Sequence, residues 1–147
     1  MEKKQKKVLV TGASGYLALH CISELLENGF IVRGSLRDIK KEKDVRRALG
    51  NKIKGDNFEV CKLNLLDDFG WDISTSNCDY LMHIASPCVV KEPKDEKEII
   101  DPAVKGTLRA LEAAHKSSVK KVILTSSIGS IVSVSYTHLT LPTSHLV

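Results

Sequence analysis

Apolar residues in this chain gather in five short runs, and a polar or amphipathic stretch follows each run. The runs are Val8–Val10, Ile31–Leu36, Phe58–Leu63, Tyr80–Ala85 and Val122–Thr125. The first is continuously apolar, which is typical of a strand buried on both faces of a parallel sheet. Each of the five runs predicts a β-strand.

Three segments between these runs are expected to be helical. In the first and third, apolar residues recur every three or four positions, and the second is a charged helix or helical turn. They cover residues 16–28, 38–49 and a stretch from about 101 to 115. Gly29 and Gly50 follow the first two segments and act as C-terminal stop signals. Asp101 and Pro102 fit the N-cap and the first helical position of the third segment.

Strands that alternate with helices along a chain form a parallel α/β sheet with right-handed crossovers. We expect a Rossmann-type, doubly wound parallel sheet with strand order 3-2-1-4-5, truncated after strand five. Ligands of such a sheet bind at the carboxyl ends of the strands, where the strand order reverses. The length of 147 residues suits one domain of this kind and excludes a second.

Composition and charge narrow the class of protein further. The chain is 42% hydrophobic with a net charge of +4, so we do not expect a disordered protein. No apolar run reaches the roughly 20 residues that cross a bilayer, and the apolar run after the basic start is too short for an export signal. Four cysteines without metal-ligand spacing predict reduced thiols and no metal site. We therefore expect a cytoplasmic protein without membrane contact.

The segment Thr11–Ala18, TGASGYLA, lies between the first predicted strand and the first predicted helix. Its first glycine allows a tight turn, and its second leaves room for a pyrophosphate to approach backbone N–H groups. The helix start adds free donors and a partial positive charge. The segment lacks the Gly-Lys-Ser/Thr of an ATP-binding P-loop, so a dinucleotide is the expected ligand. The candidate cofactor contacts in this loop are Gly12, Ser14, Gly15, Tyr16 and Leu17.

The residue that ends the second strand distinguishes the two nicotinamide cofactors. An acidic side chain there binds the 2′-hydroxyl of NAD, whereas an arginine favours the 2′-phosphate of NADP. Arg37 holds this position, with Lys40 and Lys41 nearby, so we predict NADP. The alternative is that Arg37 pairs with Asp38 or with a helix carboxylate. Residues 43–54 are basic but contain no aromatic residue, so we expect a solvated face and no nucleic-acid binding.

Six separated motifs resemble the extended short-chain dehydrogenases/reductases, in the branch of dihydroflavonol reductases, cinnamoyl-CoA reductases and bacterial or yeast aldehyde reductases. The motifs are VTGASGYLA (Val10–Ala18), VRGSLRD (Val32–Asp38), LLDD (Leu65–Asp68), CDYLMHIASP (Cys78–Pro87), PAVKGTLRALEAA (Pro102–Ala114) and VKKVILTSS (Val119–Ser127). Their order along the chain is that of the family. The resemblance implies a reductase that moves a hydride from NADPH to a small-molecule aldehyde or ketone.

The resemblance also implies roles for residues at the strand ends. Asn64 stands where the family usually has an aspartate that contacts the adenine amino group, and Leu65 would flank the adenine. The residues that would line the cofactor beyond the fourth strand are Ile84, Ala85 and Ser86. Ser127 matches the family's catalytic serine, whose hydroxyl holds the substrate carbonyl oxygen as negative charge develops on it.

The chain lacks the Tyr-x-x-x-Lys pair with which the family donates a proton during carbonyl reduction. Its tyrosines are Tyr16, Tyr80 and Tyr136, and no lysine follows Lys121. We therefore expect the chain to be the inactive cofactor-binding half of a longer reductase. His83 lies inside an apolar run and is expected to be a core residue with its hydrogen bonds satisfied.

Residues after Ser133 match no motif of the family and resemble the translation of a transposon-end sequencing adapter. The codons GTC TCT TAT ACA CAT CTG ACG CTG CCG ACG encode Val134–Thr143 without a mismatch. We expect residues 1–133 to form an incomplete NADP-binding domain and residues 134–147 to be a non-native tail. The last strand would then be an exposed apolar edge, which favours poor solubility or a homo-oligomer.

Two other functions stay open at this point. One is an NAD(P)-dependent nucleotide-sugar epimerase or dehydratase on the same scaffold, against which Arg37 and the HIASP segment argue. The other is a non-enzymatic NADP-sensing module that naturally lacks the Tyr/Lys pair.

Overall fold

The computed structural model describes residues 5–87 and 95–128. In these residues five parallel strands form one sheet in the order β3-β2-β1-β4-β5. The strands are β1 (Lys7–Val10), β2 (Ile31–Leu36), β3 (Phe58–Lys62), β4 (Tyr80–His83) and β5 (Lys121–Leu124). The predicted fold class and strand order are confirmed. The prediction of a non-native tail concerns residues that lie outside the described part.

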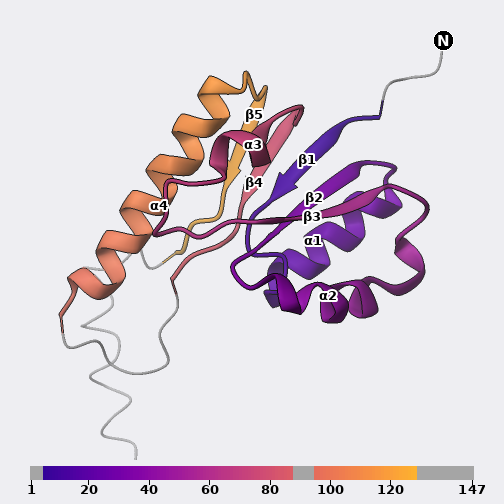
Figure 1. The fold of residues 1–147 in the computed structure, drawn as a ribbon, viewed down its shortest axis with the longest axis horizontal. Helices are drawn as coiled ribbons and strands as arrows, with labels where there is room; N and C mark the ends of the chain where they lie inside the picture. Colours follow the sequence, from indigo (N-terminus) through magenta and orange to yellow (C-terminus); the bar gives the residue numbers. More distant parts are fainter. Residues whose placement is uncertain (1–4, 88–94, 129–147) are drawn as a thin grey trace, which may run out of the picture.

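Helices cover both faces of the sheet (Figure 1). The helices are α1 (Tyr16–Glu27) and α2 (Glu42–Leu49) on one face, and α3 (Trp71–Thr75) and α4 (Lys97–Lys116) on the other. Each face buries its own core: Val10, Val32 and Leu36 pack with α1 and α2, whereas Leu9 and Leu81 pack with α3 and α4. The central strand β1 contributes to both cores, which explains its continuously apolar sequence.

The predicted charged helix over residues 38–49 is divided in two. A 3-10 helix, η1 (Ile39–Lys41), comes first and α2 follows it. Asp38 is the N-cap of η1, because its carboxylate accepts a hydrogen bond from the Lys40 N–H at 3.0 Å. Gly50 ends α2 with φ +51°, a conformation that favours glycine, and a second 3-10 helix, η2 (Gly50–Lys52), begins there.

The predicted start of α4 at Asp101 and Pro102 is wrong. The helix begins at Lys97, where the Asp95 carboxylate accepts a hydrogen bond from the Lys97 N–H at 2.9 Å. Pro102 lies inside the helix and offers no N–H to the carbonyl four residues earlier. Asp101 pairs with Lys105 one turn on, at 2.9 Å, instead of capping the helix.

The sequence pattern did not predict α3, whose five residues are too few to show a helical period. Tertiary contacts hold this helix in place. Trp71 is buried on the sheet, and its indole N–H donates to the Asp67 carbonyl at 3.0 Å. The Thr75 hydroxyl lies 2.7 Å from the hydroxyl of Ser117, which follows α4.

Apolar side chains on α4 and β5 remain exposed in the described part of the chain. They are Ile100, Val104, Leu108 and Leu111 of α4 and Ile123 and Leu124 of β5, with exposed fractions of 41–52%. The α4 residues recur at intervals of three or four and form one stripe along the helix. β5 therefore presents apolar surface at the edge of the described sheet, as expected from the sequence.

Three of the four cysteines, Cys21, Cys61 and Cys78, lie in the described residues and are free thiols. Burial raises the pKa of the Cys61 and Cys78 thiols, which keeps them protonated and unreactive at neutral pH. Cys88 lies outside the described residues. Within residues 5–87 and 95–128, no helix combines the length and apolar character needed to cross a membrane.

Candidate cofactor site

The loop between β1 and α1 turns at two glycines. Gly12 has φ +73°, which favours glycine, and a Cβ there would lie 3.1 Å from the Cβ of Ala85. The Gly15 N–H donates to the Gly12 carbonyl at 2.8 Å, and a Cβ on Gly15 would lie 3.2 Å from that same oxygen. Larger residues at either position would disturb the loop, as the sequence motif predicts.

The first turn of α1 presents free backbone donors beside these glycines. The first N–H to bond within the helix is that of Leu19, which donates to the Gly15 carbonyl at 2.9 Å. Among the described residues, none accepts a hydrogen bond from the N–H of Tyr16, Leu17 or Ala18. Ser14, Tyr16 and Leu17 are exposed, so this turn is open to a ligand. A helix start with free donors is an anion-binding site.

Neighbouring strands hold the loop at its base. Ser35 of β2 is buried, and its hydroxyl accepts a hydrogen bond from the Gly12 N–H at 3.2 Å. The Ser35 carbonyl accepts a second one from the Ala13 N–H at 2.8 Å. Gly34 allows this close approach, since a Cβ there would lie 2.9 Å from the Ala13 Cβ. Sequence reasoning missed Gly34 and Ser35, although a glycine inside a strand is a signal of close backbone contact.

The segment after β4 lies against the start of the same loop. The Thr11 hydroxyl oxygen accepts hydrogen bonds from the N–H groups of Ile84 and Ala85, each at 3.0 Å. It also lies 3.1 Å from Nδ1 of His83. His83 is a buried, hydrogen-bonded core residue, as predicted, and burial lowers its pKa. The predicted residues Gly12, Ile84 and Ala85 are thus brought together, with the exposed Ser86 next in the chain.

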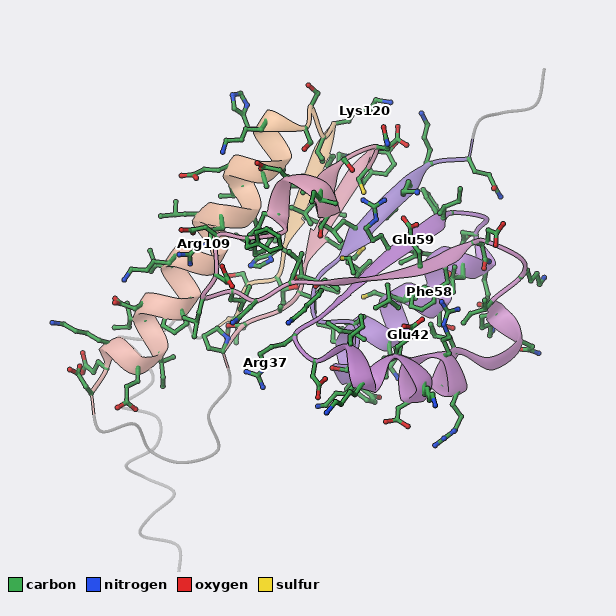
Figure 2. The ribbon with its side chains drawn as sticks, in the orientation of Figure 1. Arg37, Glu42, Phe58, Glu59, Arg109 and Lys120 are labelled. Atoms are coloured by element: carbon green, nitrogen blue, oxygen red, sulfur yellow. The ribbon has the colours of Figure 1, made fainter. Side chains whose placement is uncertain are left out.

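Arg37 lies directly after β2, at the edge of the sheet where the carboxyl ends of the strands meet (Figure 2). Its side chain is exposed, and no group in the described residues forms a hydrogen bond or ion pair with its guanidinium. The expected alternative, a pair with Asp38, is not present, because the Asp38 carboxylate caps η1.

The loop after β3 carries Asn64 and Leu65. The Asn64 side-chain oxygen accepts a hydrogen bond from the Leu66 N–H at 3.2 Å and keeps its second lone pair. Leu65 packs against α4 at Gly106, where a Cβ would lie 2.9 Å from the Leu65 Cβ. Arg109 of α4 donates to the Leu65 carbonyl at 2.7 Å. Sequence reasoning missed the packing role of Gly106, although a glycine in a helix interior signals close packing.

Ser127 lies just after β5, at the same edge of the sheet. The Thr125 N–H donates to the His83 carbonyl at 3.1 Å, which keeps this segment beside the end of β4. Ser127 is exposed. Of the three tyrosines, Tyr16 and Tyr80 lie in α1 and β4, and Tyr136 lies outside the described residues.

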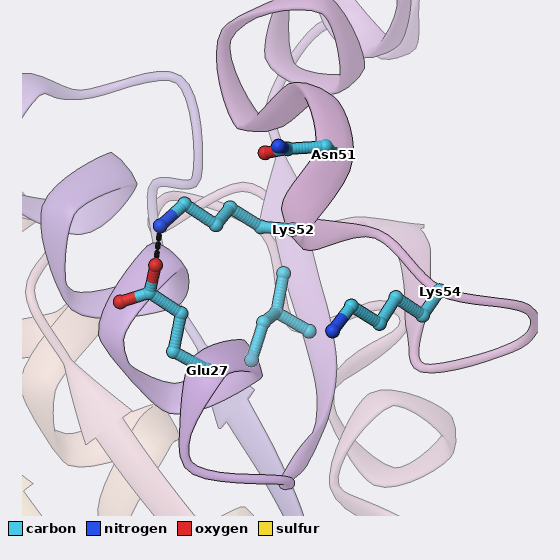
Figure 3. A pocket seen from close by; sticks show the side chains of 5 residues that line it. Glu27, Asn51, Lys52 and Lys54 are labelled. Atoms are coloured by element: carbon cyan, nitrogen blue, oxygen red, sulfur yellow. Dashed lines mark ion pairs between the residues drawn. The ribbon is translucent and has the colours of Figure 1, made fainter.

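A separate cavity of about 200 Å³ lies away from these residues (Figure 3). Its lining residues are Leu26, Glu27, Asn51, Lys52 and Lys54, from the end of α1 and from η2 and the residues after it. Glu27 and Lys52 form an ion pair across it. Because α1 runs from the phosphate loop to the opposite edge of the sheet, this cavity is not part of the candidate cofactor site.

A glycine turn, a helix start with free donors and strand ends that meet at one edge define a dinucleotide-binding Rossmann domain. Residues 8–137 match the model of the NAD dependent epimerase/dehydratase family, and the chain belongs to this family.

Relatives with named activities include cinnamoyl-CoA reductase CAD2 of Medicago truncatula, 39% identical over 127 residues, and anthocyanidin reductase of Arabidopsis thaliana, 36% identical over 127 residues. These matches cover 84% and 86% of this chain but 38% and 37% of the relatives, so the chain spans less than two fifths of their length. Yeast methylglyoxal/isovaleraldehyde reductase Gre2, solved with NADPH, has a similar structure with a TM-score of 0.72 and 29% identity. That similarity covers 82% of this chain and 37% of Gre2.

Proposed function

We propose that this chain is the cofactor-binding part of an NADPH-dependent reductase of aldehydes or ketones. The observation that carries the proposal is the exposed Arg37 guanidinium at the end of β2, on the edge of the sheet that also holds the phosphate loop. An arginine at this strand end favours a 2′-phosphate over a 2′-hydroxyl. The reductase relatives and the NADPH-bound neighbour support the same cofactor.

The described residues fit a dinucleotide. The free N–H groups of Tyr16 and Leu17 would bind pyrophosphate oxygens, with Ser14 beside them. Gly12 and Gly15 leave the space that a side chain would otherwise fill. This cradle is independent of Arg37, so it would accept NAD or NADP alike.

The remaining predicted contacts lie along the same edge of the sheet. Leu65 would flank the adenine, and the unused lone pair of the Asn64 oxygen would accept a hydrogen bond from the adenine amino group. Ile84, Ala85 and Ser86 would line the cofactor beyond β4. NADPH, when bound, supplies the hydride.

Ser127 follows β5 and matches the catalytic serine of the family that the sequence resembles, so we expect it to hold the substrate carbonyl oxygen. Its hydroxyl would donate a hydrogen bond to the oxygen as negative charge develops there. The chain has no Tyr-x-x-x-Lys pair to donate a proton. We therefore expect the purified 147-residue chain to bind NADPH without reducing simple aldehydes, and measurable turnover would contradict this expectation.

Isothermal titration of NADP⁺ and NAD⁺ into the wild-type chain and two variants tests the cofactor assignment. The wild type should prefer NADP⁺. Arg37→Ala should weaken NADP⁺ binding about tenfold or more, because a charge-assisted hydrogen bond is lost, and should leave NAD⁺ binding unchanged. Arg47→Ala is the matched control, since Arg47 is 81% exposed on α2. A preference for NAD⁺, or equal losses for both nucleotides in Arg37→Ala, would refute the proposal.

The gene sequence downstream of Ser127 tests the reductase assignment separately. A Tyr-x-x-x-Lys pair some tens of codons further on would support it, whereas an intact reading frame without the pair would favour a sensing module. Raw sequencing reads across the codon for Val134 test the tail. Reads that continue into a different sequence would support a non-native tail, and adapter-free reads that encode residues 134–147 would refute it.

A further inference from the structure

The Thr11 hydroxyl joins two segments of the candidate cofactor site. Its oxygen accepts hydrogen bonds from the Ile84 and Ala85 N–H groups, each at 3.0 Å, and lies 3.1 Å from Nδ1 of His83. Thr11 directly precedes the glycine turn, whereas Ile84 and Ala85 follow β4. A single buried hydroxyl therefore connects the phosphate loop to the segment expected to line the cofactor.

These contacts determine which nitrogen of His83 carries the proton. A hydroxyl oxygen has two lone pairs, and the N–H groups of Ile84 and Ala85 occupy both. Only the hydroxyl proton remains for the contact with His83, so Thr11 donates and Nδ1 accepts. The imidazole is therefore neutral, with its proton on Nε2.

The surroundings of the ring favour the same neutral state. His83 is 3% exposed, and burial lowers its pKa. The ring faces the hydroxyl of Thr11, which directly follows β1, and the Trp71 indole of α3, whose centroid is 6.3 Å away. The backbone N–H of Thr125, after β5, donates to the His83 carbonyl. None of these groups is charged or titratable near neutral pH, and no charged group in the described residues shifts the His83 pKa.

A proton added to His83 would bind at Nδ1, the nitrogen that contacts the Thr11 hydroxyl. Because Nε2 already carries a proton, the new one would go to Nδ1 and turn the acceptor into a donor. That donor would face an oxygen whose lone pairs are both in use. The hydroxyl would have to rotate and release Ile84 or Ala85.

We propose that Thr11 and neutral His83 are positioning residues that set the spacing between the phosphate loop and the cofactor-lining segment after β4. His83 orients the Thr11 hydroxyl, and the hydroxyl holds both N–H groups. The spacing is tight, since a Cβ on Gly12 would come within 3.1 Å of the Ala85 Cβ. The proposal rests on the cofactor site proposed above, and its test is built so that the two can fail separately.

Two measurements on the 147-residue chain test the geometry without any cofactor. Long-range ¹H–¹⁵N correlation at neutral pH should show a proton-free Nδ1 and a protonated Nε2 for His83, and a protonated Nδ1 would overturn the proposal. Amide exchange at Ile84 and Ala85 should be at least about tenfold faster in Thr11→Val, which loses the hydroxyl. It should stay slow in Thr11→Ser, which keeps the hydroxyl. Unchanged exchange in Thr11→Val would also overturn the proposal.

NADP⁺ is the probe for the positioning role. Thr11→Val and His83→Leu should bind it about tenfold more weakly than the wild type, because each leaves buried polar groups without partners. Thr11→Ser and His83→Asn should stay within about threefold, since the Asn oxygen accepts a hydrogen bond in place of Nδ1. Wild-type affinity in Thr11→Val would overturn the proposal. A wild-type chain that binds neither NADP⁺ nor NAD⁺ would refute the proposed function, while the NMR and exchange results would still decide the geometry.

The pH dependence of the NADP⁺ affinity distinguishes a positioning role of His83 from a general effect on stability. The NADP⁺ 2′-phosphate titrates in the measurements on both wild type and His83→Asn, so the ratio of the two affinities cancels its contribution. The folded-state pKa of His83 lies below the ordinary value of about 6.5. The wild-type affinity should therefore fall relative to His83→Asn only as NMR shows His83 becoming protonated in acid. A ratio that does not follow His83 protonation would overturn the proposal.

Discussion

Arg33 of β2 connects the short helix α3 to the sheet. Its Nε donates to the Glu59 carboxylate at 2.7 Å, and one Nη donates to the carbonyls of Ile73, Ser74 and Ser76 at 3.1, 2.7 and 3.0 Å. These carbonyls lie at the C-terminal end of α3, where a helix leaves its acceptors unpaired. Five residues are too few for a stable isolated helix, so α3 depends on such contacts.

Arg33→Met keeps the apolar stem and removes every donor. The Arg33 side chain is 14% exposed, so water replaces its hydrogen bonds poorly. Breaking a fully buried charged network typically costs about 3–5 kcal/mol, and this network is only partly buried because the Glu59 side chain is 42% exposed. Two features place the expected cost at the low end of that range. One Nη has only two hydrogens for three carbonyls, and Glu59 keeps its hydrogen bond from the Lys7 ammonium at 2.9 Å. We expect the free energy of unfolding to fall by about 3 kcal/mol.

Urea unfolding followed by tryptophan fluorescence measures this effect directly. Trp71 is the only tryptophan of the chain and lies buried in α3, so its emission reports the docking of that helix. Arg47→Met is the matched control, because Arg47 is 81% exposed and should cost less than about 0.5 kcal/mol. A loss below about 1 kcal/mol in Arg33→Met, with Trp71 emission unchanged, would show that packing alone holds α3.

Gly106→Ala should lower the melting temperature and shift the NMR signals of Leu65, because the new Cβ lies 2.9 Å from the Leu65 Cβ. Overpacking costs about 1–3 kcal/mol against a helix-propensity gain of about 1 kcal/mol, so a raised melting temperature would refute this reasoning. Asp79 accepts hydrogen bonds from the Lys120 ammonium at 2.8 Å and the Lys7 N–H at 3.1 Å, which hold its pKa well below the usual range. An unfolded aspartate titrates near pH 3.9, so this contribution to stability is present above about pH 4 and is lost as the pH falls toward the folded pKa. The melting temperatures of wild type and Asp79→Asn should therefore converge in acid, and a constant difference would contradict the assignment.

The sheet could be predicted from the sequence because its central strands are buried on both faces. Val8, Leu9 and Val10 are at most 1% exposed, and no polar residue interrupts their run. The strand order is the one typical of a dinucleotide-binding Rossmann fold, which the glycine motif after the first strand indicates. The strand ends could be placed only within two residues, since they depend on pairing with a neighbour: β4 ends at His83 with its partner Leu124, although the apolar run continues to Ala85.

The helices on the α3–α4 face were harder to predict because residue types alone do not determine where they begin. Asp101 and Pro102 have the residue types of a helix start, but α4 begins at Lys97, whose N–H donates to the Asp95 carboxylate. α3 has no local signal of comparable strength. Its C-terminal end is held by Arg33, which is about 40 residues away in the sequence.

The same distinction between local signals and long-range contacts applies to the residues of the candidate site. Residues expected to touch the cofactor, such as Gly12 and Arg37, could be predicted because the topology brings the strand ends together and the motif supplies the turn. The residues that support them act across long sequence separations: Thr11 holds Ala85, and Gly106 sets the place of Leu65. These residues lie within the sequence motifs, but the motifs do not show which of them contact one another; only Gly106, a glycine in a helix interior, is itself a signal of close packing. Substitutions at these supporting positions should therefore change cofactor affinity through the spacing of the site.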